Sequence, residues 1–101
     1  MPFAYVMQNL QPGMAAKRPS WNGYVKKTVA TGAEEGSYSL TFKKRDGTEN
    51  KYDVTATGIT VASGSSAVLM DPELLAAMLS DDWITGSIDT FESARSGSGT
   101  W

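Results

Sequence analysis

The fold is decided by the stretch YSLTFKKRDGTENKYDVTA, residues 38–56. Apolar and polar side chains alternate over 38–43 and again over 52–56, which is the period of a strand with one apolar face. Between the two runs lies Asp46-Gly47, a dipeptide favoured in tight turns because such turns need a positive φ. The stretch therefore predicts an antiparallel hairpin, and the other elements are placed around it.

Two short helices are predicted, one before the hairpin and one after it. Residues 3–11 carry apolar side chains at helical spacing, and Pro12-Gly13 ends that pattern. The second helix begins at Asp71-Pro72-Glu73, where the aspartate caps free backbone N–H groups and the proline takes the first helical position. This helix is expected to run to about Leu79.

The remaining segments complete a small domain. Further short strands are expected at 14–18, 24–29, 59–61 and 81–84. Loops are expected at 31–36 and 63–66, and the apolar residues 67–70 form a brief buried strand or the approach to the second helix. The pattern indicates an α+β fold, a small antiparallel sheet packed by an N-terminal helix and a short helix in the C-terminal half. Residues 1–92 would form this single domain, and the Ser/Gly-rich residues 93–101 a flexible tail.

Composition excludes several kinds of chemistry. The chain has 101 residues, enough for one small core, and contains no cysteine and no histidine. Disulfides, thiolate nucleophiles and zinc–sulfur sites are therefore excluded, as are imidazole bases and Ser-His-Asp triads. We expect a protein that is not an enzyme, with no catalytic residues, no metal and no cofactor.

Charge is distributed unevenly along the chain. Residues 17–51 hold eight of the nine basic residues and carry a net charge of +4, whereas residues 52–101 carry −6. The isoelectric point of about 4.9 argues against binding of polymeric nucleic acid. The split allows a local anion site, oppositely charged faces that attract each other in an oligomer, or only solvated strand faces. Lys43-Lys44-Arg45 forms a basic tip beside the hairpin turn, and such a tip is usually just solvated.

The start of the sequence shows no basic leader followed by an apolar core, and no apolar run approaches the ~20 residues of a membrane helix. We therefore expect a soluble protein that neither enters nor crosses a membrane.

The segment RPSWNG, residues 18–23, combines the parts of a nucleotide site. Trp21 offers a ring face on which a base can stack, Arg18 a cation for phosphate, and Asn22 an amide with both donors and acceptors. Gly23 lets a ligand approach the backbone. The alternative is structural: Trp21 anchors a loop to the core, and Asn22-Gly23 only turns the chain.

A second aromatic segment, Asp81-Asp82-Trp83, places two carboxylates beside a tryptophan. Adjacent residues of a strand point to opposite faces, so the two carboxylates would not converge on a cation or a substrate. The structural interpretation packs Trp83 into the core and uses Asp81 to orient a loop, while the role of Asp82 stays open. Neither GxxxxGK[ST] nor GxGxxG occurs, so nucleotide hydrolysis and dinucleotide chemistry find no support.

Taken together, the two tryptophan segments resemble a family. A short amphipathic helix ending at Gly13 is followed by KRPSWNG at 17–23, a sheet region and LSDDW at 79–83. This order is similar to the small phage proteins that inhibit Thoeris immunity, the second Thoeris anti-defence family, whose typical members carry GWNG after a basic residue and LLAEDW near the C-terminus. Pro19-Ser20 replaces the residues before the first tryptophan, and the similarity spans about residues 3–85.

The resemblance implies a sponge, a homotetramer that sequesters its ligand without cleaving it in the cytoplasm of the infected bacterium. The ligand would be the cyclic ADP-ribose isomer made by the Thoeris TIR enzyme. The resemblance also implies that some members of this family hold cyclic di- or trinucleotides, the signals of CBASS immunity, at separate sites. Trp21 and Asn22 would contact base and ribose, and Arg18 a phosphate. The candidate ligand-binding residues carried over are Trp21, Asn22, Arg18, Trp83, Gly23 and Asp82.

Two other functions stay open at the level of sequence. One is a virion or host-takeover protein whose exposed tryptophans contact another protein, and the other is a small carboxylate-based nucleotide phosphodiesterase. A sponge needs no proton shuttle, which suits a chain without histidine or cysteine. A protomer of this size is too small for a deep private cavity, so the resemblance favours a pocket between subunits.

Overall fold

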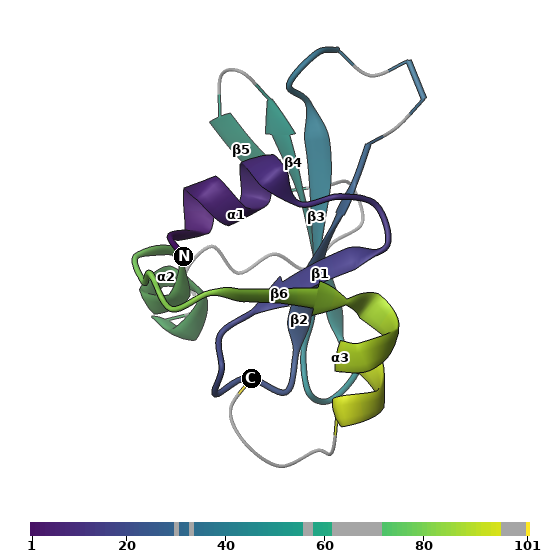
Figure 1. Ribbon diagram of the computed structural model, residues 1–101. Coiled ribbons are helices and arrows are strands. Elements are labelled where there is room, and N and C mark those ends of the chain that lie inside the picture. The colour runs from purple at the N-terminus through teal and green to yellow at the C-terminus, as the bar shows by residue number, and fades with distance from the viewer. Residues whose placement is uncertain (30, 33, 56–57, 62–71, 96–100) are drawn as a thin grey trace.

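The computed structural model describes residues 1–29, 31–32, 34–55, 58–61, 72–95 and 101. Within these residues it contains three helices and six strands (Figure 1). The helices are α1 (Phe3–Asn9), α2 (Pro72–Met78) and α3 (Ile88–Ala94). The strands are β1 (Met14–Lys17), β2 (Tyr24–Thr28), β3 (Tyr38–Lys43), β4 (Glu49–Thr55), β5 (Gly58–Val61) and β6 (Ile84–Ser87).

The strands form one antiparallel sheet of order β5-β4-β3-β2-β1-β6. From β1 to β5, each strand pairs with its neighbours in the sequence. β6 instead returns to the start of the chain and pairs with β1, in a register that places Met14 opposite Ser87 and Lys17 opposite Ile84. The predicted α+β class with an antiparallel sheet is confirmed.

The central hairpin forms where the alternation of side chains predicted it. β3 and β4 pair up to Lys43 opposite Glu49, and the chain turns between these two residues. Gly47 takes a φ of +88°, and its N–H donates to the Lys44 carbonyl at 3.0 Å. Glycine adopts this φ without the clash that a Cβ causes, which is why the Asp-Gly signal was informative.

α1 buries one side of a short helix against the sheet, as its apolar spacing predicted. The chain then reverses into β1 through a tight turn, in which the Met14 N–H donates to the Gln11 carbonyl at 3.0 Å. Pro12 and Gly13 occupy the two central positions, and Gly13 has a φ of +84°. Proline followed by a glycine of positive φ is the type II pattern, so the Pro-Gly pair ends the helix and also starts the sheet.

Side chains pack on both faces of β1 and β2. Ala16 and Val25 belong to the main core, together with buried side chains of α1, α2, β3 and β4. Ala15 and Tyr24 point the other way, because successive residues of a strand face opposite sides, and they pack with Phe91 of α3. α3 therefore covers the face of β1 and β2 that is turned away from the main core.

The C-terminal part of the chain differs from the prediction. The last strand lies at Ile84–Ser87 rather than at 81–84, and it leads directly into α3, a helix that the sequence analysis did not predict. The last residues of α3, 93 and 94, fall in the segment predicted as a flexible tail. Its seven residues lie directly before the Ser/Gly-rich end of the sequence, and the composition of that end led to the prediction of a tail.

α2 begins at Pro72 as predicted. The predicted loop at 63–66, the apolar segment at 67–70 and the helix cap at Asp71 lie outside the described residues. None of the helices in the described part of the chain has the length and apolar character needed to cross a membrane.

Candidate functional site

The segment 18–23 links β1 to β2 by a turn that lies earlier than expected. The Trp21 N–H donates to the Arg18 carbonyl at 3.0 Å, so the turn is centred on the exposed Pro19-Ser20. Proline fixes φ near the value that the first central position of a turn requires. The chain bends again at Asn22, but Gly23 does not take the positive φ of a tight Asn-Gly turn.

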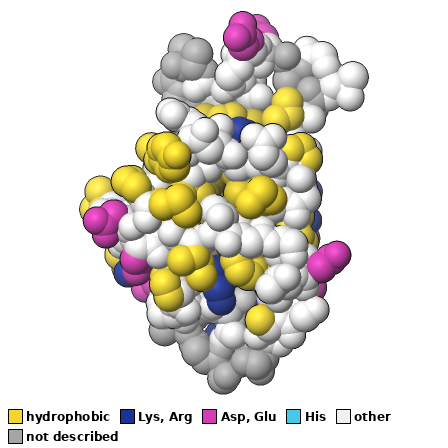
Figure 2. Space-filling view, viewed as in Figure 1, with side chains coloured by type: hydrophobic (Ala, Val, Ile, Leu, Met, Phe, Trp, Pro, Cys, Tyr) yellow, Lys and Arg dark blue, Asp and Glu magenta, His cyan; other side chains and the backbone are white. Residues whose placement is uncertain are grey.

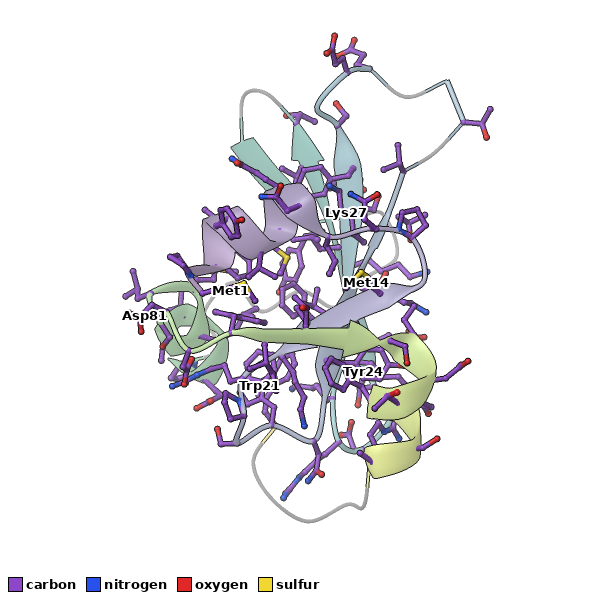
Figure 3. The ribbon with its side chains drawn as sticks, viewed as in Figure 1. Met1, Met14, Trp21, Tyr24, Lys27 and Asp81 are labelled. Atoms are coloured by element: carbon purple, nitrogen blue, oxygen red, sulfur yellow. The ribbon has the colours of Figure 1, made fainter. Side chains whose placement is uncertain are left out.

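Aromatic rings pack around Trp21, which is labelled in Figure 3. Trp21 is 2% exposed and Trp83 is 1% exposed. Trp101 stacks on Trp21, with ring centroids 4.3 Å apart and planes 27° from parallel. Trp83 meets Trp21 edge-on at 5.2 Å. The structural interpretations of both residues are confirmed, since Trp21 anchors its loop to the core and Trp83 lies within that core.

Glu73 of α2 joins Arg18 to Trp21. Its Oε1 accepts hydrogen bonds from Trp21 Nε1 at 2.9 Å and from Arg18 Nη1 at 3.4 Å. Arg18 also binds Asp82, with Nε 3.1 Å from Oδ1 and Nη2 3.3 Å from Oδ2. The side chains of Arg18 and Asp82 are 22% and 43% exposed, so this ion pair meets solvent and contributes about 0.2–1 kcal/mol.

The main chain beside Trp21 forms a second part of the site. The N–H groups of Gly23 and Arg45 both donate to the main-chain oxygen of Trp101, at 3.2 and 3.0 Å. A Cβ on Gly23 would lie 2.6 Å from this oxygen and would overlap the Lys43 carbonyl. The absence of a side chain at Gly23 is therefore what allows the oxygen to approach, and Figure 1 shows the C-terminal residue beside the segment that links β1 to β2.

Asp81 and Asp82 have separate contacts. The Asp82 carboxylate faces Arg18, whereas the Asp81 carbonyl accepts a hydrogen bond from the Met1 nitrogen. Met1 and Asp81 are both labelled in Figure 3. The Met1 carbonyl in turn accepts from the Trp83 N–H at 3.2 Å. In the part of the chain that the structure describes, no group of three or more acidic side chains could hold a metal ion.

A further polar cluster lies between β2, β3 and α3. Tyr24 Oη donates to Glu92 Oε2 at 2.6 Å, and Lys43 Nζ lies 3.1 Å from Glu92 Oε1. Burial and the hydrogen bond to this carboxylate raise the pKa of Tyr24 to about 12. The hydrogen bonds from Tyr24 and Lys43 lower the pKa of Glu92 below its usual value. Sequence reasoning missed this cluster, because nothing in the local pattern relates α3 to β2.

The fold brings both tryptophan segments into one cluster. Glu73 links Arg18 to Trp21 there, while Arg18 pairs directly with Asp82 and Trp21 contacts Trp83. Asn22 is half-buried beside Trp21 and already takes part in an interaction within the chain.

Two residues of the cluster were missed by the sequence analysis, Glu73 and Trp101. Glu73 had been interpreted only as part of a helix start. The one signal for Trp101 was a large aromatic residue at the end of a Ser/Gly-rich segment.

No protein-family model matches the chain, and neither a curated protein nor a solved structure matches it significantly. The resemblance to the second Thoeris anti-defence family therefore rests on the motif residues themselves, at 17–23 and 79–83.

Proposed function

We propose that this protein binds a cyclic ADP-ribose isomer, the signal of bacterial Thoeris immunity, and sequesters it without cleavage. The stack on Trp21 carries the proposal: its ring receives a second aromatic ring at 4.3 Å. Beside that stack, two main-chain N–H groups converge on one oxygen. An adenine ring with a nearby phosphate oxygen would use the same two kinds of contact, since a base stacks on aromatic rings and an anionic oxygen accepts from N–H groups.

Three basic residues contact this stack or its neighbours, and Lys44 places its charge beside it. Lys44 Nζ is 5.8 Å from the centroid of the Trp101 ring, and Arg45 provides one of the two converging N–H groups. Arg18 is linked to Trp21 through Glu73. A stacked base contributes about 1–3 kcal/mol, and a charge-assisted hydrogen bond about 1.5–3 kcal/mol. A few such contacts are enough to retain a nucleotide without any chemical step.

Binding without cleavage suits the side chains at hand. The sequence has no histidine and no cysteine. Two carboxylates belong to the cluster around Trp21, those of Glu73 and Asp82, and both are hydrogen-bonded to Arg18. They position a cation and an indole, whereas a phosphodiesterase would need a carboxylate directed at the reacting phosphate.

The competing function as an interaction module relied on exposed tryptophans, but Trp21 and Trp83 are 2% and 1% exposed. The apolar surface lies elsewhere: Figure 2 shows hydrophobic side chains gathered over α1 and β6. Tyr5 is 57% exposed there and Ile84 39%. We propose that further copies of this chain cover this face in a homotetramer, in the cytoplasm of the infected bacterium. Cyclic di- or trinucleotides would occupy separate sites.

The test is a retention experiment. The purified protein is incubated with the cyclic ADP-ribose isomer, unbound ligand is removed, and the protein is denatured by heat so that the released material can be identified. Intact ligand in the supernatant supports sequestration. Cleavage products would show an enzyme instead, and an empty supernatant would contradict both functions.

Paired leucine variants test the place of binding. Trp21→Leu fills much of the core volume but removes the stacking face, so we expect retention to fall by about tenfold or more. Phe91→Leu is the matched control and should keep retention unchanged, since Phe91 is also a buried aromatic residue but packs with Ala15 and Tyr24 on the other face of the sheet. Retention that survives in a folded Trp21→Leu protein, as judged by circular dichroism, would show that the ligand binds elsewhere.

A further inference from the structure

Trp101 makes the contacts of a bound ligand. One face of its indole lies on Trp21 at 4.3 Å, and the edge-to-face contact with Phe42 of β3 is 5.9 Å. Lys44 Nζ lies 5.8 Å from its ring centroid, within the range of a cation–π contact. The ring is thus enclosed by two aromatic side chains and a cation, all supplied by segments remote from it in sequence.

The main-chain oxygen of Trp101 accepts two converging hydrogen bonds, as a bound anionic oxygen would. Two N–H groups from different loops, those of Gly23 and Arg45, donate to it at 3.2 and 3.0 Å. Two N–H donors directed at one oxygen favour a negative charge on that oxygen. The glycine is needed for this approach, because a Cβ there would lie 2.6 Å from the oxygen. A ring site and an oxygen site therefore lie side by side.

We infer that Trp101 occupies a binding site for a planar aromatic ring joined to an anionic oxygen, and that it competes there with the external ligand. The identity of that ligand as a nucleotide rests on the function proposed above. The chemistry of the site rests only on the contacts of Trp101.

Competition follows from the geometry of Trp21. Its edge is closed by Trp83 at 5.2 Å, and the residue is 2% exposed while Trp101 is in place. The face under Trp101 is therefore the face on which a base would stack, and one face accepts one ring. Trp101 is part of the same chain, so it competes at an effective concentration of the order of millimolar. A nucleotide can then bind only after Trp101 has left the face of Trp21. The apparent affinity of the unmodified protein for the nucleotide is therefore lower than that of a protein in which this face is empty.

The first test uses N-acetyltryptophan, which offers the same indole and a carboxylate oxygen. In calorimetric titrations of the full chain, we expect Trp101→Ala to bind N-acetyltryptophan and the unmodified protein to bind it at least about tenfold more weakly. N-acetylalanine, which lacks the ring, should bind neither. Leu79→Ala is the matched control, because Leu79 is 90% exposed and makes no part of the site. Equal binding by Trp101→Ala and the unmodified protein would overturn the inference.

A conservative variant provides a second test in case Trp101→Ala does not fold. Trp101→Phe keeps a ring on Trp21 with a smaller stacking area, so we expect binding of N-acetyltryptophan between those of the unmodified protein and Trp101→Ala. If Trp101→Ala does not fold, this intermediate affinity still supports competition, and an unchanged affinity contradicts it.

Titration with the cyclic ADP-ribose isomer separates this inference from the proposed function. Tighter binding by Trp101→Ala, by about tenfold, supports both. Equal binding by both proteins leaves the sponge intact and overturns the competition. Binding of N-acetyltryptophan by Trp101→Ala without binding of the nucleotide by either protein supports the aromatic–anion site and contradicts the proposed function.

Discussion

Tyr24 and Glu92 share a hydrogen bond of 2.6 Å between the sheet and α3, and it changes how both groups titrate. The pKa of Tyr24 rises from 10.0 to about 12, mainly through burial and then through its bond to Glu92. A raised pKa means that the folded state holds this proton more tightly than the unfolded state does. Its stabilisation is therefore complete below pH 10.0 and is lost as the pH rises towards about 12.

We expect Tyr24→Phe to remove this alkaline dependence, because phenylalanine has no proton to lose. The free energy of unfolding, measured with urea at a series of pH values, should fall between pH 10.0 and about 12 in the unmodified protein and stay flatter in the variant. In a pH titration followed by near-ultraviolet absorbance, the variant should show one fewer tyrosine that ionises at high pH than the unmodified protein. Tyr5→Phe is the control, since Tyr5 is 57% exposed. Identical alkaline profiles for Tyr24→Phe and the unmodified protein would contradict the assignment.

Single residues also show what the sequence could reveal about the site. Arg18 and Trp21 were identifiable because they lie in one short segment with chemistry suited to a nucleotide. Glu73 was not, because its contacts with Arg18 and Trp21 arise only when α2 packs beside the β1–β2 turn. Gly23 was noted as a glycine that allows approach, and the structure shows which atom approaches it, the oxygen of Trp101.

Among the elements, α3 is stabilised by a side-chain cap in its first turn and by the packing of one aromatic residue. Ser87 Oγ accepts from the Thr90 N–H at 3.1 Å, which caps the start of the helix. Phe91 packs over Gly86, where a Cβ would lie 2.9 Å from its ring. β6 and α3 thus form a compact unit that attaches to β1 by its strand and to Tyr24 by its helix.

Ser87→Ala should destabilise the protein by about 1 kcal/mol, because it removes the side-chain cap of α3. Chemical denaturation monitored by circular dichroism gives the value. Ser93→Ala is the matched control: Ser93 lies exposed within the same helix, and alanine there should leave stability unchanged or slightly raised. Equal effects of the two substitutions would show that the cap contributes nothing.

Elements with a regular apolar spacing or a clear turn or helix-start signal were the predictable ones. The β3–β4 hairpin was found because its two strands repeat one alternation on both sides of Asp46-Gly47. α3 and the position of β6 were not found, because the register of β6 is set by pairing with β1 rather than by its own side chains, most of which are exposed. Trp101 was assigned to a tail by the composition around it, although a single aromatic side chain can be held by distant residues.

For the whole molecule, the proposed homotetramer predicts a mass of about four times 10.8 kDa in sedimentation equilibrium. Ile84→Lys places a charge on the apolar face over α1 and β6 and should reduce the assembly to smaller species. Val29→Lys is the control, since Val29 is 58% exposed but belongs to neither α1 nor β6. A monomer at all concentrations would contradict both the tetramer and a pocket shared between subunits.

The return of β6 to β1 has a consequence for the order of folding. Pairings from β1 to β5 join strands that are neighbours in the sequence, so each closes a short loop. β1 pairs on its other side only with β6, where Met14 lies opposite Ser87, so this pairing closes a much longer loop. During synthesis, β1 therefore has an open edge until nearly all of the described chain has been made. Loop-closure entropy rises with the length of the loop, which makes the β1–β6 pairing the late step. The surface that holds Asp82 and Trp83 next to Trp21 is then assembled last, after the meander already exists.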